Sequence, residues 1–153
     1  MPQPRLNDPM LTIPADILHS ILAHARAEHP DMACGLVAGP IDSDRPERFV
    51  RMRNAEASTS FWSFDPEEQL RTWIEMDRRD EEPVVIYYSQ NCAGATLSDT
   101  SLRFATEENV HYLVVSTYEQ AREEYRSYRV RDGVAVGEKI VVVDGAPGWQ
   151  RPS

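Results

Sequence analysis

Polar side chains gather in residues 84–101, VVIYYSQNCAGATLSDTS, directly after a run of apolar residues. They supply a phenol, a carboxamide, a thiol and two hydroxyls, from Tyr88, Gln90, Cys92, Ser98 and Ser101. Such groups can orient a substrate and donate hydrogen bonds without a metal. The phenol, the carboxamide and the hydroxyls are poor zinc ligands, because a phenol with a pKa of about 10 stays neutral and amide or hydroxyl oxygens bind zinc weakly. The segment is therefore a candidate for polar chemistry that needs no metal.

The two cysteines, Cys34 and Cys92, are far apart and belong to no CxxC or Cys/His array. This spacing argues against a disulfide framework or a structural zinc site. Cys34 lies in the apolar run ACGLVA and is expected to be a small buried side chain. Cys92 lies in a loop, where only a helix N-terminus is expected nearby to lower its thiol pKa. We favour an inert Cys92 and keep a reactive thiol as the alternative.

The histidines show no metal-binding spacing. His19, His24 and His29 are five residues apart, whereas two ligands on one helical face need a spacing of four. Each is expected to be an exposed or half-buried helix residue. His111 opens a predicted strand, and we expect a structural histidine with satisfied hydrogen bonds there.

The strand that carries Tyr88 is predicted over Val84–Tyr88, a continuous β-prone run that is typical of a strand buried on both faces. A second buried strand is predicted over His111–Thr117. Between them, residues 90–97 form a loop, and Ser98 is a candidate N-cap for a short helix to Ala105. The strand ends and this loop must therefore position the pocket.

A helix is predicted after Asp65, which is a natural N-cap followed by Pro66 at the first helical position. Glu68 stands where a capping-box carboxylate returns to the cap amide. We expect the helix to bury Leu70, Trp73, Ile74 and the apolar neighbours of Asp77. The aromatic run before it is expected to pack in the core or at its rim: Phe61, Trp62 and Phe64.

The remaining elements complete an α/β domain. A short strand over Met10–Ile13 precedes a helix that ends near His29 and Pro30. Residues 33–38 and 48–53 form a strand pair, and a closing hairpin joins 125–131 to 134–143 through Asp132 and Gly133. We expect one mixed, twisted sheet flanked by helices, a single domain over residues 10–143, and tails at 1–9 and 144–153.

Four segments in this order resemble the JAMM/MPN (Mov34/MPN/PAD-1) metallopeptidases, in particular the short bacterial members that process ubiquitin-like sulfur-carrier proteins. They are PDMACGLVAG, FDPEEQL, VVIYYSQNCAGATLSDTS with HYLVVST, and RSYRVRDG. The family motif has two histidines one residue apart, a seven-residue loop and then Ser-x-x-Asp. The resemblance implies an MPN-like (cytidine-deaminase-like) fold.

The resemblance also implies where the zinc chemistry would lie. By this resemblance, the three zinc-ligand positions are occupied by Tyr88, Gln90 and Ser101, and the position of the catalytic glutamate by Met32. Ser98 is the motif serine that this chain retains. It can contact an oxyanion, as the family's serine does, or serve only as a helix cap. A catalytic zinc needs three such ligands and a carboxylate that takes a proton from a water whose pKa is about 7. These replacements predict a pseudoenzyme without zinc or another cofactor, and not a functional zinc metallopeptidase.

Composition sets the remaining bounds. The 153 residues are 41% hydrophobic, which is enough for one core without disulfides. The net charge of −9 disfavours nucleic acid. No long apolar segment or signal-like N-terminus is visible, so no membrane association and a cytoplasmic location are expected.

Three functions remain open. The first is a binding or scaffolding module for a ubiquitin-like sulfur carrier or a catalytic MPN paralogue. The second is a metal-independent biosynthetic enzyme that uses the vacated pocket on a small molecule. The third, ranked last, is a zinc isopeptidase with an unconventional site. A homodimer is compatible with each of them.

Overall fold

The computed structural model describes residues 10–91, 109–119 and 124–144. The predicted loop and short helix over 90–105, with Cys92, Ser98 and Ser101, lie almost entirely outside these ranges, as do both terminal segments. The described elements follow in this order: β1 (Met10–Pro14), α1 (Ala15–Glu28), β2 (Cys34–Pro40), β3 (Arg48–Met52), α2 (Pro66–Arg78), β4 (Glu81–Gln90), β5 (His111–Ser116), β6 (Tyr125–Arg131) and β7 (Val134–Val143).

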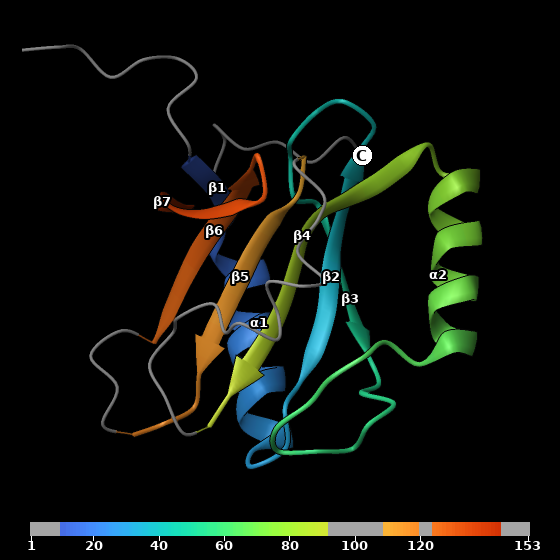
Figure 1. Ribbon diagram of the computed structural model, residues 1–153. Helices are drawn as coiled ribbons and strands as arrows, with labels where there is room; N and C mark the ends of the chain where they lie inside the picture. The colour runs from blue at the N-terminus through green and yellow to red at the C-terminus, as the bar shows by residue number, and fades with distance from the viewer. Residues whose placement is uncertain (1–9, 92–108, 120–123, 145–153) are drawn as a thin grey trace, which may run out of the picture.

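The strands form one mixed, curled sheet in the order β1-β7-β6-β5-β4-β2-β3 (Figure 1). The pairs β1/β7 and β4/β5 are parallel, and the other neighbours are antiparallel. The strand β4 lies between β5 and β2, which explains its continuous apolar run, because both of its faces and both of its edges are covered. The expected α/β class with a mixed sheet is confirmed.

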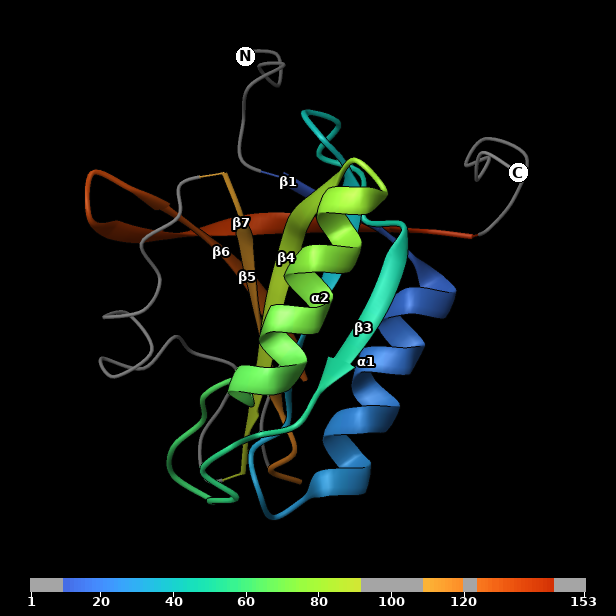
Figure 2. The ribbon, with the colours of Figure 1, turned by 90° about the vertical axis from the view of Figure 1, so that its right-hand side faces the viewer.

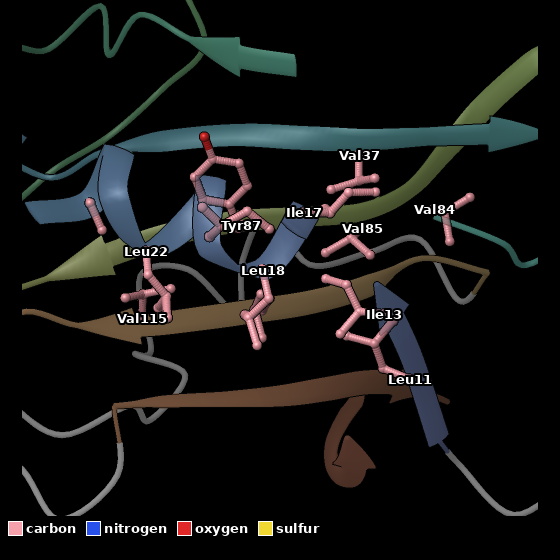
Figure 3. Close-up of a cluster of buried hydrophobic side chains, with 13 residues drawn as sticks. Leu11, Ile13, Ile17, Leu18, Leu22, Val37, Val84, Val85, Tyr87 and Val115 are labelled. Carbon is pink, nitrogen blue, oxygen red and sulfur yellow. The ribbon is translucent and has the colours of Figure 1, made fainter. Parts of the chain in front are cut away.

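The two helices lie on opposite faces of the sheet. On one face, α1 packs its apolar side against the strands, as Figure 3 shows for Ile17, Leu18, Val85 and Tyr87. On the other face, α2 packs beside β4 and β2 (Figure 2). Because side chains alternate along a strand, Tyr87 points to the α1 side and Tyr88 to the opposite side. Neighbouring residues of β4 therefore serve two separate cores.

The closing hairpin has the turn that the sequence predicts. Asp132 has φ 51° and Gly133 has φ 76°, so both central residues are in the left-handed region. A two-residue loop of this kind matches the twist of the flanking strands. The turn fixes the register of β6 and β7, with Arg131 opposite Val134.

The start of α2 agrees with prediction in part. The side chain of Asp65 accepts a hydrogen bond from Glu68 N at 3.1 Å, and Pro66 is the first helical residue. The Glu68 carboxylate does not return to the cap amide. It accepts from Arg53 N at 2.6 Å, while Asp65 N donates to the Arg53 carbonyl at 3.1 Å. The predicted capping box is therefore half formed, because the segment after β3 supplies the second pair of bonds.

The prediction that α2 buries Leu70, Trp73 and Ile74 is wrong. These side chains are 63%, 37% and 43% exposed, whereas Thr72 and Met76 face the sheet and are buried. Thr72 and Met76 are four residues apart and define the inner face, so Leu70 and Ile74 point away from it. The helix contacts the sheet through a narrow cluster of Leu36, Ala38 and Met76.

Neither helix in the described part of the chain has the length and apolarity that crossing a bilayer requires.

Candidate functional site

The candidate site lies at the C-terminal end of β4, on the face opposite α1. Tyr88 and Gln90 are two residues apart on this strand and so share a face. Met32 lies two residues before the paired strand β2, where Cys34 lies opposite Tyr88. Met32, Cys34 and Tyr88 belong to one apolar cluster, so the fold brings two of the predicted site positions into the same core.

The main chain holds the Met32 position firmly. Met32 N donates to the Ser58 carbonyl at 2.9 Å, and the Asn54 amide donates to the Met32 carbonyl at 3.0 Å. Ala33 N donates to the Ser89 hydroxyl at 2.8 Å, and Ser89 N donates to the Ala33 carbonyl at 3.0 Å. Met32 is 6% exposed at this fixed point.

Tyr88 is enclosed by aromatic side chains. It is 1% exposed, and the Trp62 indole stacks on its ring with centroids 5.5 Å apart and 16° between the planes. Phe64 supports Trp62 from a centroid distance of 5.4 Å. The expected core or rim packing is confirmed for Trp62 and Phe64, whereas Phe61 is 57% exposed. The sequence identified the aromatic run but gave no signal that Trp62 covers Tyr88.

Gln90 ends β4 beside the end of β5. Its carbonyl accepts from Thr117 N at 2.9 Å, and the residue is half-buried. The adjacent Asn91 side chain donates to the Pro30 carbonyl at 2.7 Å. These contacts tie the end of β4 to the β5 end and to the segment after α1.

The described residues at this end of β4 do not supply the ligands of a catalytic zinc. Such a site needs three nitrogen, sulfur or carboxylate ligands. Within residues 10–91, 109–119 and 124–144, no three histidine, cysteine, aspartate or glutamate side chains are grouped so as to hold a metal ion. The phenol ring of Tyr88 is stacked against Trp62, and the Met32 thioether cannot accept a proton from a bound water.

Cys34 is a buried free thiol, as predicted. Burial raises its pKa to about 12, and the negative charges of Glu68 and Glu28 act in the same direction. A thiol of this kind is protonated at neutral pH and is neither a nucleophile nor a ready metal ligand.

His24 departs from the expectation of an exposed or half-buried helix residue, because it is only 6% exposed. Its Nδ1 lies 2.6 Å from the Tyr87 hydroxyl, and the two groups share a hydrogen bond. Burial lowers the pKa of His24, helped by Arg51 and opposed by Glu28. The helical spacing from Ile17 and Ile21 places residue 24 on the buried face, so this signal was present in the sequence.

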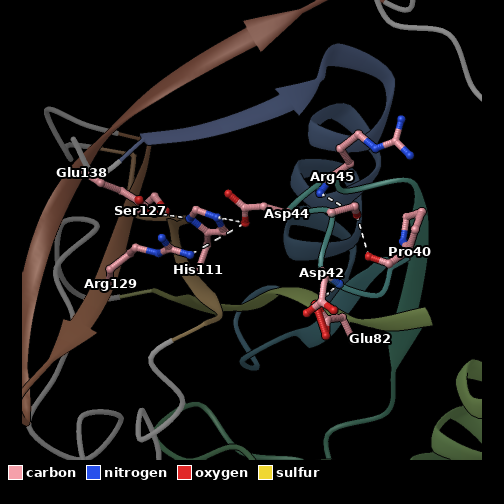
Figure 4. A network of polar contacts seen from close by, with 10 residues as sticks. Pro40, Asp42, Asp44, Arg45, Glu82, His111, Ser127, Arg129 and Glu138 are labelled. Atoms are coloured by element: carbon pink, nitrogen blue, oxygen red, sulfur yellow. Dashed lines mark hydrogen bonds and ion pairs between the residues drawn. The ribbon is translucent and has the colours of Figure 1, made fainter. Parts of the chain in front are cut away.

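His111 is the satisfied structural histidine that the sequence predicts. Its ring nitrogens lie 2.6 Å from Glu138 Oε2 and 2.7 Å from Asp44 Oδ1, and Ser127 also donates to Glu138 (Figure 4). Burial alone would lower the pKa of His111, but the two carboxylates outweigh burial and raise it. The same contact lowers the pKa of Asp44 against the effect of its own burial. Neither acidic partner was predicted, because both are remote in sequence.

A hollow of about 340 Å³ lies beside Met32, at the free edge of β3. Side chains of both charges line it: His24, Glu28, Asp31, Arg51, Arg53 and Glu68. Arg51 is exposed and lies 3.6 Å from Glu28. The hollow offers cations and carboxylates next to Met32, the residue that the resemblance sets at the position of a catalytic glutamate.

Comparison with known proteins supports the resemblance. Residues 14–131 match a family model described as prokaryotic homologues of the JAB domain. Proteins named CysO-cysteine peptidase from Mycobacterium tuberculosis and Mycobacterium bovis are 48% identical over 135 residues, which cover 88% of this chain and 92% of each relative.

Two solved structures have the same fold. A solution structure of a protein from Desulfitobacterium hafniense superposes with a TM-score of 0.76 at 26% identity, covering 91% of this chain and 96% of that one. A crystal structure of a JAB1/MPN domain protein from Archaeoglobus fulgidus has a TM-score of 0.56 at 18% identity, covering 85% and 98%. The chain therefore belongs to the Prok-JAB family, the prokaryotic homologues of the JAB domain, and folds as a single JAB/MPN domain.

Proposed function

We propose that this chain is a JAB/MPN-fold binding module that holds a ubiquitin-like sulfur-carrier protein without hydrolysing a peptide bond. The observation that carries the proposal is the packing of Met32 and Tyr88 in one apolar cluster under Trp62. These residues occupy positions that the resemblance assigns to the catalytic base and to a zinc ligand. The Met32 thioether cannot act as a general base, and the stacked Tyr88 phenol is a poor metal ligand.

The choice of partner rests on the relatives. Proteins 48% identical to this chain are named CysO-cysteine peptidase, so a related carrier and its cysteine adduct are the first ligands to test. The hollow beside Met32 can receive the C-terminal segment of such a carrier, because Arg51 and Arg53 can pair with its terminal carboxylate. A catalytic MPN paralogue is the alternative partner.

A metal-independent enzyme at the same end of β4 is the second candidate. Its support is the common face of Tyr88 and Gln90, which places a phenol and a carboxamide on one side of the strand. This candidate predicts that the protein converts a small molecule, and that the turnover rate falls when Tyr88→Phe removes the hydroxyl. Unchanged turnover in that variant would remove this candidate.

The binding function is tested by calorimetric titration with a ubiquitin-like sulfur-carrier protein from the same organism. The carrier is prepared with a free C-terminal carboxylate and as its C-terminal cysteine adduct. We expect saturable one-to-one binding with a Kd on the order of micromolar and an unchanged adduct mass after incubation. The absence of binding to both forms would reject the carrier as the partner.

A further inference from the structure

The loop between β2 and β3, residues 41–47, is fastened to β5 and β7 through one imidazole. His111 at the start of β5 is buried, with Nε2 2.7 Å from Asp44 Oδ1 of the loop and Nδ1 2.6 Å from Glu138 Oε2 of β7 (Figure 4). We propose that the contact between His111 and Asp44 is a proton-operated latch, which holds the loop closed while the ring is charged and releases it when the ring loses its proton.

Two carboxylates require two N–H donors from the ring. A charged imidazolium has an N–H at each nitrogen, whereas the neutral ring has one donor and one lone pair. In the closed loop, both ring nitrogens of His111 face carboxylate oxygens, so a neutral ring would set its lone pair against one of them. The closed arrangement therefore requires the charged ring, and the raised pKa of His111 agrees with this requirement.

The carboxylate that leaves is the exposed one. The Glu138 side chain is 0% exposed and also accepts from the Ser127 hydroxyl, so solvent cannot reach it to replace the ring N–H. The Asp44 side chain is 53% exposed, and water can solvate it after release. Leaving a buried carboxylate without a donor costs more free energy than leaving an exposed one. The single N–H of the neutral ring therefore stays with Glu138, and Asp44 is released.

The backbone of the loop favours release once the latch is lost. Asp42 and Asp44 have φ 63° and 54°, in the left-handed region that is unfavourable for most residues other than glycine. The loop also folds back closely on β2, where an added Cβ at Gly39 would lie 1.8 Å from the Arg45 carbonyl oxygen. Backbone in such conformations persists only where the surrounding contacts hold it.

The charged groups that face His111 come from three elements. Besides Asp44 of the loop and Glu138 of β7, β6 contributes Arg129, whose Nη2 lies 3.7 Å from Asp44 Oδ1. That separation is longer than a hydrogen bond, so Arg129 reduces the repulsion after deprotonation without replacing the imidazole. Two further charges of the loop form their own ion pair at 3.8 Å: Arg45 and Glu47.

The direction of the pH dependence follows from the folded-state pKa of His111, which is raised above 6.5. The loop is closed below about pH 6.5 and opens as pH rises through that folded-state value. The latch lies at the start of the β4/β5 pair, where His111 is opposite Val85, whereas Gln90 and the candidate site lie at its end. The proposal is therefore independent of carrier binding.

The test follows the ring and the loop in the same sample of the full chain. NMR of the ring nitrogens reports the protonation of His111. Amide hydrogen exchange, corrected for its intrinsic pH dependence, reports the loop through Ser43 N, which donates to the Pro40 carbonyl, and Arg45 N, which donates to the Ser43 hydroxyl. We expect the protection of these amides to fall at least about tenfold as His111 loses its proton, with the same midpoint.

Asp44→Asn is the decisive variant, and Asp42→Asn is its matched control. Both remove one charge from an exposed loop residue with positive φ, a conformation that asparagine tolerates. The carboxamide introduced by Asp44→Asn can donate to a neutral ring or accept from a charged one, so loop protection should no longer depend on pH. Asp42→Asn should keep the wild-type pH dependence.

Loop protection that stays constant while His111 titrates would overturn the proposal, as would a wild-type pH dependence in Asp44→Asn. A ring that stays charged until the whole chain unfolds would also overturn it, because the loop would then have no transition of its own. Circular dichroism at each pH shows where the fold remains intact.

Discussion

The indole of Trp62 lies nearly parallel to the phenol ring of Tyr88, with 5.5 Å between ring centroids. Tyr88 stands at a position where the resemblance places a zinc-binding histidine, yet it is 1% exposed and part of an apolar cluster with Met32. In this chain the end of β4 is therefore part of a packed apolar core. Substitutions here should change the stability of the fold more than any metal-dependent property.

Tyr88→Ala should lower the free energy of unfolding by about 3 to 5 kcal/mol, as expected for a large buried aromatic side chain. Phe61→Ala, at a 57% exposed position, is the control and should change it by less than about 0.5 kcal/mol. Urea unfolding followed by circular dichroism measures both values. Equal stabilities of the two variants would contradict the packed role of Tyr88.

His111 should make the fold more sensitive to high pH. Its pKa in the folded protein is raised above 6.5, so its contribution to stability is fully present below about pH 6.5 and is lost as pH rises through the folded-state pKa. His111→Asn removes this dependence. Denaturant unfolding of both proteins at several pH values on the two sides of neutrality gives the comparison, and parallel profiles would refute the assignment.

His24 should have the opposite effect. Its pKa is lowered by burial, so the folded state holds the ring neutral and loses stability as pH falls below about 6.5, where the unfolded chain takes up a proton. His24→Gln should reduce this loss of unfolding free energy at acidic pH, as measured by denaturant unfolding at several pH values. His19→Gln, outside the buried face of α1, is the control and should leave the pH dependence of the unfolding free energy unchanged.

Arg51→Glu should weaken carrier binding by about tenfold or more, because a carboxylate replaces a guanidinium at the edge of the hollow beside Met32. Arg131→Glu makes the same charge change at an exposed site on the β6/β7 hairpin and should bind like wild type. Calorimetric titration separates a local contact from a general effect of net charge. Equal losses in both variants would count against the hollow as the docking place.

Local signals predicted much of the fold. The Asp132-Gly133 turn, the Asp65 cap with Pro66, and the β-prone run at Val84 act through neighbouring residues, so the sequence displays them directly. They fixed the hairpin, the start of α2 and the central strand.

The sequence failed where the outcome depends on distant partners. Glu68 bonds Arg53 N and not its own cap, because a segment after β3 comes within reach. The periodicity of α2 marks an apolar face through Leu70 and Ile74, but only the tertiary packing decides that Thr72 and Met76 face the sheet. The Trp62 cover on Tyr88 likewise joins residues far apart in the chain.

The most direct measurement of the central claim is intact-mass analysis of a carrier–cysteine adduct incubated with zinc. Wild-type protein should leave the adduct unchanged. The variant carrying Met32→Glu, Tyr88→His, Gln90→His and Ser101→Asp, which restores the family's residues, should release cysteine in a reaction that a chelator stops. Chelator-sensitive release by the wild-type chain would contradict the claim that this JAB domain has lost its zinc chemistry.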